Sequence, residues 1–229
     1  MKVLITGATG TIGSAILKHL LLNPAITSII VLSRRALPAH ISSPKLTTII
    51  VQEFASYDGT LLAQLVSADA AVWAMGTTDA NHEVNYVYPT AFFTALMDAR
   101  KASQQVGAGK RLHYVRVCGA FTERDQDRSL WFYDAPRKLH GLSEAKTLEL
   151  GEQYKDVCRT WVVKPGGVAT SGVWAMECLG GLLGGGVVIG DEKLGAFVAD
   201  LVVRGEEEEG RVWNGRMVVK GGELLRGGK

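Results

Sequence analysis

The stretch Thr6-Gly7-Ala8-Thr9-Gly10-Thr11-Ile12-Gly13 decides how this chain folds. It follows a short apolar run, Val3 to Ile5, that is typical of a buried strand, and it leads into apolar residues at helical spacing. Glycines at such a junction allow a sharp turn, a close approach of the backbone to a pyrophosphate, and tight packing of helix on sheet. The segment, with Thr9, Thr11 and Ile12 between its glycines, therefore predicts a dinucleotide site.

Strand and helix patterns alternate along the chain beyond this turn. Continuous apolar runs without polar alternation indicate strands that are buried on both faces, which is typical of a parallel sheet. The next predicted strands are residues 29–32, 48–51, 70–73, 112–117 and 160–163, and the predicted helices are 12–20, 60–66, 89–102 and 143–153. This order predicts an α/β fold with a doubly wound parallel sheet, the Rossmann arrangement.

We expect a single nucleotide-binding Rossmann domain over residues 1–229, in which residues 1–165 form the nucleotide-binding core. Residues 166–229 are then a smaller segment that caps the substrate side and contributes the last helix and strand. Their composition is less regular. The expectations are a loop where six glycines lie between Gly180 and Gly190, a helix over 194–202, a solvated helix end at 206–209, a strand over 217–219 and a flexible end at 225–229.

Composition excludes several classes of protein. Of the 229 residues, 47% are hydrophobic and 21% are charged, which is enough apolar material for a core and excludes general disorder. Twenty-five Lys and Arg against 23 Asp and Glu give a net charge of +2, too small for a strong polyanion binder, so nucleic acid is not an expected partner. A small-molecule substrate is expected instead, and the oligomeric state is left open.

Cysteine usage and hydropathy indicate the cellular compartment of the protein. Cys118, Cys158 and Cys178 show no C-x-x-C spacing, so neither a disulfide framework nor a zinc site is predicted. Asp125 and Asp127 are flanked by arginines, which indicates a salt-bridged loop, so no metal site is expected. The early glycines argue against a signal peptide and no apolar stretch is long enough to span a membrane, so we expect a cytoplasmic protein.

The residues after the second predicted strand select the nucleotide. An acidic residue about 20 residues beyond the glycine motif would hold a ribose 2′-hydroxyl and favour NAD. This chain has Ser33-Arg34-Arg35 there. A serine hydroxyl and two guanidinium groups are suited to a 2′-phosphate, because arginine forms charge-assisted, forked hydrogen bonds. NADP(H) is therefore the predicted cofactor.

The Thr-Gly-x-x-Gly-x-x-Gly spacing resembles that of the extended and atypical short-chain dehydrogenases/reductases. The resemblance covers about residues 1–170 and continues in Asn85 before the long helix and in Lys164-Pro165-Gly166. It implies that Glu53 lies near the adenine amino group with the Phe54 backbone beside it. It also implies that the stretch holding Met75, Gly76 and Thr77 lines the ribose on the nicotinamide side.

The family's catalytic pattern is incomplete in this chain. That pattern has a tyrosine, a lysine four residues later on the same helix face, and a serine at the end of the preceding strand. We expect Lys146 at the lysine place, where it would act in catalysis or bind the nicotinamide ribose, but Leu142 then stands for the tyrosine and Cys118 ends the strand. Tyr133 is the candidate substitute phenol, and His140 is a nearby imidazole.

Two of the three expected catalytic groups are thus missing, and the resemblance implies cofactor binding more directly than it implies catalysis. The leading hypothesis is an NADP(H)-dependent oxidoreductase that acts on a small carbonyl or alcohol compound. Two alternatives stay open. One is a regulatory module that senses NADP(H) without turnover, and the other is an isomerase that retains its cofactor.

Overall fold

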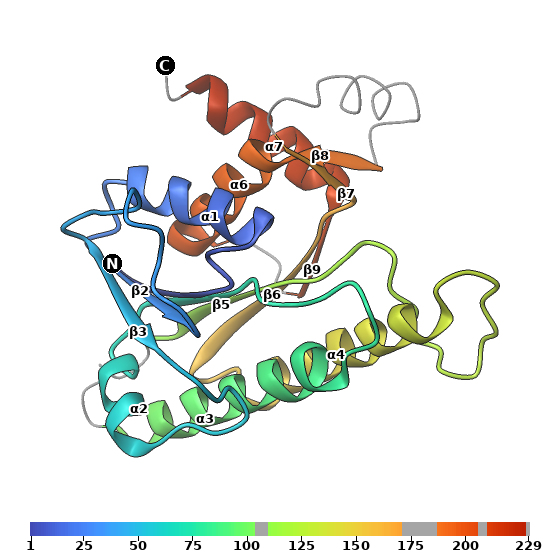
Figure 1. Ribbon diagram of the computed structural model, residues 1–229, viewed down its shortest axis with the longest axis horizontal. Helices are drawn as coiled ribbons and strands as arrows, with labels where there is room; N and C mark the ends of the chain where they lie inside the picture. The colour runs from blue at the N-terminus through green and yellow to red at the C-terminus, as the bar shows by residue number, and fades with distance from the viewer. Residues whose placement is uncertain (104–109, 171–186, 206–209, 228–229) are drawn as a thin grey trace.

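The computed structural model describes residues 1–103, 110–170, 187–205 and 210–227. A seven-stranded parallel sheet forms its centre, in the order β3-β2-β1-β4-β5-β6-β9 (Figure 1). Its strands are β1 (Lys2–Thr6), β2 (Ser28–Ser33), β3 (Leu46–Ile50), β4 (Ala70–Trp73), β5 (Leu112–Val117), β6 (Cys158–Lys164) and β9 (Gly210–Trp213). The order runs outward in opposite directions from β1 and β4, so a topological switch point lies between these two strands.

Helices cover both faces of the sheet (Figure 1). One layer holds α1 (Thr11–Leu22), α6 (Asp191–Arg204) and α7 (Asn214–Gly227). The opposite layer holds α2 (Gly59–Leu65), α3 (Tyr88–Ala102) and α4 (Asp134–Gln153), with a π-helical turn, η1 (Glu83–Val87), leading into α3. A separate pair of parallel strands, β7 (Gly167–Ala169) and β8 (Val188–Gly190), lies outside the main sheet. The predicted doubly wound Rossmann fold is confirmed.

The core consists of two apolar clusters, one on each face of the sheet. Successive side chains of a strand point to opposite faces, so Val3 and Ile5 join the cluster under α1 and α6, while Leu4 joins the cluster under α2, α3 and α4. All three side chains are at most 1% exposed. Burial on both faces is the physical reason why the strand sequences are continuous apolar runs.

Helix α4 begins nine residues earlier than the sequence pattern predicts, at Asp134 rather than Ser143. Two residues that usually disfavour a helix explain why the sequence pattern does not predict this first part of α4. Pro136 lies in the first turn, where its missing N–H costs no helical hydrogen bond. Gly141 is unfavourable in an isolated helix, but a Cβ there would lie 1.8 Å from the carbonyl oxygen of Glu123, so close packing of a loop requires glycine.

The carboxyl-terminal segment differs most from expectation. Residues 217–219 are part of helix α7 and not a strand, and the last strand is β9. Met217 and Gly221 face the core at helical spacing, and Gly221 packs against the backbone of Lys193 in α6. The expected flexible end also proves helical as far as Gly227. A run of three apolar residues is too short to distinguish a strand from a helix.

Two expected features lie at the edge of what the structure describes. Most of the six-glycine stretch and the whole charged run 206–209 fall outside the described residues. The end of the glycine stretch, Val188 to Gly190, forms β8 rather than a loop and pairs in parallel with β7.

Candidate functional site

The glycine turn between β1 and α1 contains two glycines that packing requires and one that it does not. Gly7 has a φ of +71°, and a Cβ there would lie 2.5 Å from the carbonyl oxygen of Ala74. At Gly13 a Cβ would lie 2.0 Å from the carbonyl oxygen of Gly7. At Gly10, where φ is −83°, a Cβ would meet only the Gly7 carbonyl oxygen, at 3.4 Å. Packing against the described residues thus does not explain Gly10.

The beginning of α1 fits an anionic ligand. Gly10 is the N-cap residue, no side chain caps the helix, and its first turn contains no acidic residue. The backbone N–H groups at a helix N-terminus lack intrahelical partners and carry partial positive charge, which favours phosphate. The small residue at position 10 leaves room for such a ligand beside them. The turn therefore fits the pyrophosphate of a dinucleotide.

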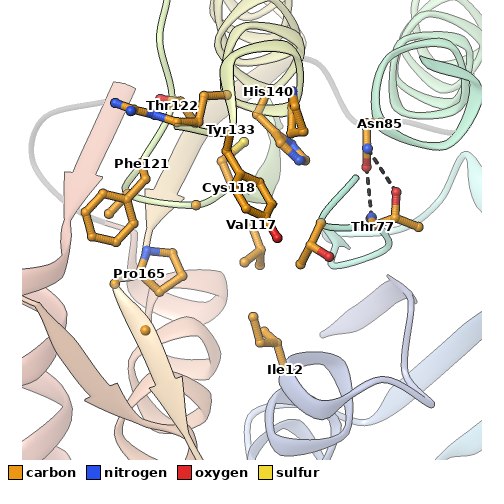
Figure 2. A pocket seen from close by; sticks show the side chains of 18 of the residues that line it. Ile12, Thr77, Asn85, Val117, Cys118, Phe121, Thr122, Tyr133, His140 and Pro165 are labelled. Atoms are coloured by element: carbon orange, nitrogen blue, oxygen red, sulfur yellow. Dashed lines mark hydrogen bonds between the residues drawn. The ribbon is translucent and has the colours of Figure 1, made fainter. Parts of the chain in front are cut away.

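A cavity of about 620 Å³ opens beside this turn (Figure 2). Its walls are Ile12 of α1, residues 74–78 after β4, residues 116–122 at the end of β5, residues 165–167 after β6, and the beginning of α4. These segments follow the carboxyl ends of neighbouring parallel strands, next to the switch point between β1 and β4. The volume is within the range of small-molecule sites, roughly 300–1,000 Å³.

The predicted cofactor residues lie in three groups along this edge of the sheet. Ile12, Met75, Gly76 and Thr77 line the cavity itself. In the second group, Ser33 ends β2 and Arg34 and Arg35 follow it, and both arginine side chains are exposed. The third group, Glu53 and Phe54, follows β3. The strand order places the second and third groups on the β1 side, away from α4.

The third group has a structural role of its own. Glu53 is exposed, and its carboxylate accepts a hydrogen bond from the Ala55 N–H at 2.6 Å. Phe54 is 1% exposed and packs edge-on against Trp73 in the core, with ring centroids 6.1 Å apart. Only the backbone of Phe54 is therefore left to contact a ligand at this edge.

Asn85 holds the loop after β4 in place. Its Oδ1 accepts from the Thr77 N–H at 2.8 Å, and its Nδ2 donates to the Thr77 hydroxyl at 3.0 Å (Figure 2). Its Nδ2 also donates to the carbonyl oxygen of Asp79 at 2.9 Å. Asn85 belongs to the π-helical turn η1, a type of irregularity that is frequent at functional sites. One amide side chain thus fixes a wall of the cavity.

The side of α4 that faces the cavity does not include Lys146, which was expected to act in catalysis or to bind the nicotinamide ribose. Lys146 does not line the cavity, and its ammonium forms an ion pair with Glu149 at 2.7 Å on the helix surface, which raises its pKa. The cavity is lined instead by Pro136, Arg137 and His140, from the first turns of α4. Since α4 begins at Asp134, its first two turns are the ones that reach the carboxyl ends of the strands.

Tyr133 is where the sequence placed it, against the cavity. It directly precedes α4, and Figure 2 shows its hydroxyl pointing into the cavity. Its φ of +51° is the only positive φ of a non-glycine residue in the described parts of the chain. Such conformations are strained and concentrate at functional sites. The phenol makes no hydrogen bond to the rest of the described chain, so it is available to a ligand.

His140 and Cys118 add two titratable groups to the cavity. Burial, followed by the positive charge of Arg116, lowers the pKa of His140, and a hydrogen bond with the backbone of Thr77 opposes this. The imidazole is therefore neutral at neutral pH. Burial also raises the pKa of Cys118, which is free of any disulfide and stays a thiol. Cys118 directly follows the last residue of β5, Val117, at the place expected for it.

Arg116 is a buried cation that the sequence analysis missed. Its guanidinium donates to the backbone oxygens of Ser143 at 2.9 Å and Asn85 at 2.8 Å, and to the Thr147 hydroxyl at 2.6 Å. These bonds tie β5 to α4 and η1 beneath the cavity floor. An arginine within an otherwise apolar strand was the available signal, because a buried charge must be paired or hydrogen-bonded.

A second buried charge cluster lies behind the cavity wall. Glu144 of α4 is fully buried and forms ion pairs with Lys164 of β6 and with Arg211 of β9. The hydroxyl of Thr122, which lines the cavity, donates to the same carboxylate at 2.8 Å. The carboxylate therefore joins a helix, two strands and the loop after β5.

Known structures share this architecture. The oxidoreductase ylbE from Lactococcus lactis superposes with a TM-score of 0.67 and 14% identity, over 99% of this chain and 96% of that chain. A short-chain dehydrogenase/reductase from Burkholderia thailandensis gives 0.64 and 18%, over 98% and 97%. This chain has the fold of the short-chain dehydrogenases/reductases. The Bordetella bronchiseptica enzyme WbmF, solved in complex with NAD+, gives 0.61 and 17%, over 97% and 77%.

Similarity at the sequence level is confined to a part of the chain. No model of a protein family matches it. An 80-residue stretch is 40% identical to the protein "FMP52, mitochondrial" of Candida albicans, and covers 35% of each chain. An 81-residue stretch is 38% identical to the protein of the same name in Emericella nidulans, over 34% of this chain and 35% of that one. The matches thus span about a third of these relatives.

The names of these relatives correct the expected location. Both are named as mitochondrial proteins, so the expectation of a cytoplasmic protein was wrong.

Within the described parts of the chain, no helix is long and apolar enough to cross a membrane. The same parts contain no cluster of three or more His, Cys, Asp or Glu side chains that could hold a metal ion.

Proposed function

We propose that this protein is an NADP(H)-dependent oxidoreductase that acts on a carbonyl or alcohol compound in the cavity beside α4. The observation that carries this proposal is the open space beside Gly10. A Cβ at position 10 would meet only one atom of the described residues, the Gly7 carbonyl oxygen. The turn also adjoins a cavity at the switch point of the sheet. A glycine that packing does not require, at an uncapped helix N-terminus, is explained by a pyrophosphate.

The remaining cofactor contacts follow from the position of each group along the sheet edge. Ser33, Arg34 and Arg35 would hold the 2′-phosphate of the adenosine ribose, since no side-chain hydrogen bond or ion pair engages either guanidinium within the described chain. Glu53 and the backbone of Phe54 would lie beside the adenine, and residues 75–77 beside the nicotinamide ribose. When bound, the nicotinamide would supply or accept a hydride in the cavity.

Tyr133 is the group that we assign to proton transfer. During reduction the carbonyl carbon gains a hydride, and the carbonyl oxygen must gain a proton from an acid within reach. The Tyr133 hydroxyl points into the cavity and has no other partner among the described residues. His140 also lines the cavity and is the second candidate donor, although burial lowers its pKa and so disfavours the protonated imidazole. Lys146 has no part in this step, because it pairs with Glu149 outside the cavity.

Cofactor choice is tested by titrating NADPH and NADH into the protein in a calorimeter. We expect tighter binding of NADPH, and loss of that preference in Arg34→Ala and Arg35→Ala, because a charge-assisted hydrogen bond to phosphate contributes about 1.5–3 kcal/mol. Equal affinities in the wild-type protein, or a preference for NADH, would contradict the NADP(H) assignment. The dinucleotide site itself would still stand.

Chemistry is tested by following NADPH consumption with a panel of aldehydes and ketones. Tyr133→Phe should lower turnover about 10²–10⁴-fold without weakening NADPH binding, as expected when a general acid is removed. Lys146→Ala, on the same helix but outside the cavity, is the matched control and should leave turnover unchanged. A strong loss in His140→Gln with full activity in Tyr133→Phe would move the donor to His140.

The two alternative functions give different results in the same assays. A regulatory NADP(H) sensor would bind the nucleotide and consume none with any carbonyl. A cofactor-retaining isomerase would convert its substrate without net consumption of nucleotide. The names of the Candida and Emericella relatives further suggest that the activity belongs to mitochondria, which imaging of the full-length tagged protein would test.

A further inference from the structure

Among the described residues, the cavity is lined by two arginines and a histidine and by no carboxylate. Arg116, Arg137 and His140 belong to the lining, whereas no Asp or Glu does. Arg116 is 4% exposed, and its guanidinium donates hydrogen bonds to Ser143, Thr147 and Asn85. It therefore forms part of the cavity floor. His140 is neutral because its pKa is lowered by burial. Arg137 is thus the cation whose charge is left to the cavity.

The side chain of Arg137 interacts electrostatically with Asp134, but it makes no hydrogen bond or ion pair with the described residues. Its Nε is buried and makes no hydrogen bond, and its guanidinium forms no ion pair with the described residues. The acids nearby are already engaged, since Asp134 pairs with Lys138 at 3.1 Å and Glu123 pairs with Arg128 at 3.1 Å. The buried Nε is out of reach of a ligand, but Arg137 borders the cavity without an ion pair among the described residues, so an anionic group of a ligand can pair with its guanidinium there.

The walls around this guanidinium are apolar. Phe121 and Phe132 line the cavity and are nevertheless 63% and 56% exposed, so their rings present an open apolar surface to a ligand. Pro136 and Pro165 add further apolar surface to the lining. Burial of such rings against an apolar ligand removes nonpolar surface from water and is favourable. Among the described residues, the site therefore combines one cation without an ion pair, Arg137, with apolar walls.

The helix geometry places this cation near the proposed proton donor. Arg137 follows Tyr133 by four residues, and its N–H donates to the Tyr133 carbonyl oxygen at 3.1 Å, closing a helical turn. Tyr133 has a left-handed backbone, with a φ of +51°, so its side chain does not continue the helical row, but both side chains line the same cavity. A ligand whose carbonyl oxygen meets Tyr133 can therefore place an anionic group against Arg137 when a short body, such as one ring, separates the two ends.

We propose that Arg137 binds the carboxylate of the substrate, and that the substrate class is a carbonyl compound with an apolar, ring-sized body and a carboxylate. The proposal rests on the proposed function for the identity of the reacting group. Binding of the carboxylate itself depends only on this cavity. The planar guanidinium fork matches a carboxylate in two parallel hydrogen bonds, which a lysine could not reproduce.

Binding is tested first, because it does not depend on turnover. Benzoate and methyl benzoate are titrated into the full-length protein by calorimetry in the presence of NADP+. We expect benzoate to bind more tightly than its ester, and Arg137→Met to weaken benzoate binding about tenfold or more while the ester is unaffected. Arg124→Met, which removes an exposed arginine outside the cavity, is the matched control and should change neither affinity.

Turnover is tested with para-formylbenzoate and its methyl ester, which share one body. Arg137→Met should lower kcat/KM for the acid about tenfold or more and leave that for the ester unchanged. Arg137→Lys should recover only part of the loss. Circular dichroism and the thermal midpoint must show that each variant is folded.

The outcomes separate this proposal from the proposed function. Benzoate binding that depends on Arg137, without reduction of either aldehyde, supports the carboxylate site and overturns the oxidoreductase. Reduction of both aldehydes with equal efficiency, and an equal effect of Arg137→Met on acid and ester, overturns the carboxylate site and leaves the oxidoreductase in place. Equal binding of benzoate to the wild type and to Arg137→Met also overturns it.

Discussion

The glycines of the turn after β1 meet two different requirements. Gly13 is required by the backbone of Gly7, with which any Cβ would overlap, whereas Gly10 has space around it. Close packing of helix on sheet and access for a pyrophosphate are therefore separate functions of neighbouring residues. Substitution can therefore test the two functions separately, because a change at Gly13 should affect folding and a change at Gly10 should affect only nucleotide binding.

Gly10→Val should fold normally and lose nucleotide binding. The branched side chain would occupy the space proposed for the pyrophosphate without striking protein atoms. Gly13→Ala should instead destabilise the protein by about 1–3 kcal/mol, because its Cβ forces the Gly7 backbone to move. Urea unfolding and calorimetric titration of both variants check these expectations. Nucleotide binding retained in folded Gly10→Val would mean that the turn is only architectural.

Helix α4 carries the site on its first turns and anchors it by its middle. Glu144, in the middle, is fully buried between Lys164 and Arg211. Breaking a buried ion pair from one side leaves an uncompensated charge in the interior, which costs more than the pair contributes. The cluster therefore sets the position of α4 against β6 and β9, and through Thr122 that of the cavity wall.

Glu144→Gln should lower the free energy of unfolding by about 3–5 kcal/mol, since both cations lose their counter-charge. Glu152→Gln provides the control on the same helix. Glu152 pairs with Lys155 at the surface, where both side chains are mostly exposed, so no measurable change is expected. Chemical denaturation monitored by circular dichroism measures both. Equal stabilities of the two variants would show that the buried cluster does not anchor α4.

The burial pattern of helix α7 leads to a second prediction at the scale of a single element. In a strand, Met217 and Val219 would share a face, whereas in a helix they point in different directions. Met217 is fully buried and Val219 is 56% exposed. Met217→Ala should therefore cost about 2–5 kcal/mol, and Val219→Ala should stay within about 0.5 kcal/mol. Similar losses in both variants, measured by urea unfolding, would favour the strand expected from the sequence.

At the scale of the whole molecule, the proposed cofactor contacts lie along one edge of the sheet. They follow β1, β2, β3 and β4, while the proposed substrate contacts follow β5 and β6 and extend to α4. A ligand held along this edge would bridge both halves of the doubly wound fold. Binding to the folded state alone must then stabilise the entire domain by mass action.

NADPH at about 100 times its dissociation constant should contribute about 2.7 kcal/mol to stability. For a chain of this length, this corresponds to a rise of roughly 5–10 °C in the thermal midpoint. Differential scanning calorimetry with and without nucleotide measures the shift, and Gly10→Val is the control that should not respond. An unchanged midpoint in the wild-type protein would contradict specific binding of NADPH.

The sequence alone determined the architecture, because the features that specify it are local. A buried parallel strand must be a continuous apolar run, and a tight strand-to-helix turn needs glycine, so β1, α1 and the alternation of strands and helices along the chain could be predicted from short windows. The position of Tyr133 against the cavity was also predictable. Each of these inferences depends on residues that are neighbours along the chain.

Tertiary structure alone decided which side chains meet. Lys146 has the expected spacing on a helix, but α4 begins at Asp134, so its earlier turns, with Arg137 and His140, reach the cavity. The buried pairing of Glu144 with Arg211 joins residues that are 67 positions apart. Helix α7 forms because Met217 and Gly221 find α6 to pack against. Contacts between distant segments leave no local pattern, since each residue's burial depends on a partner that the chain supplies elsewhere.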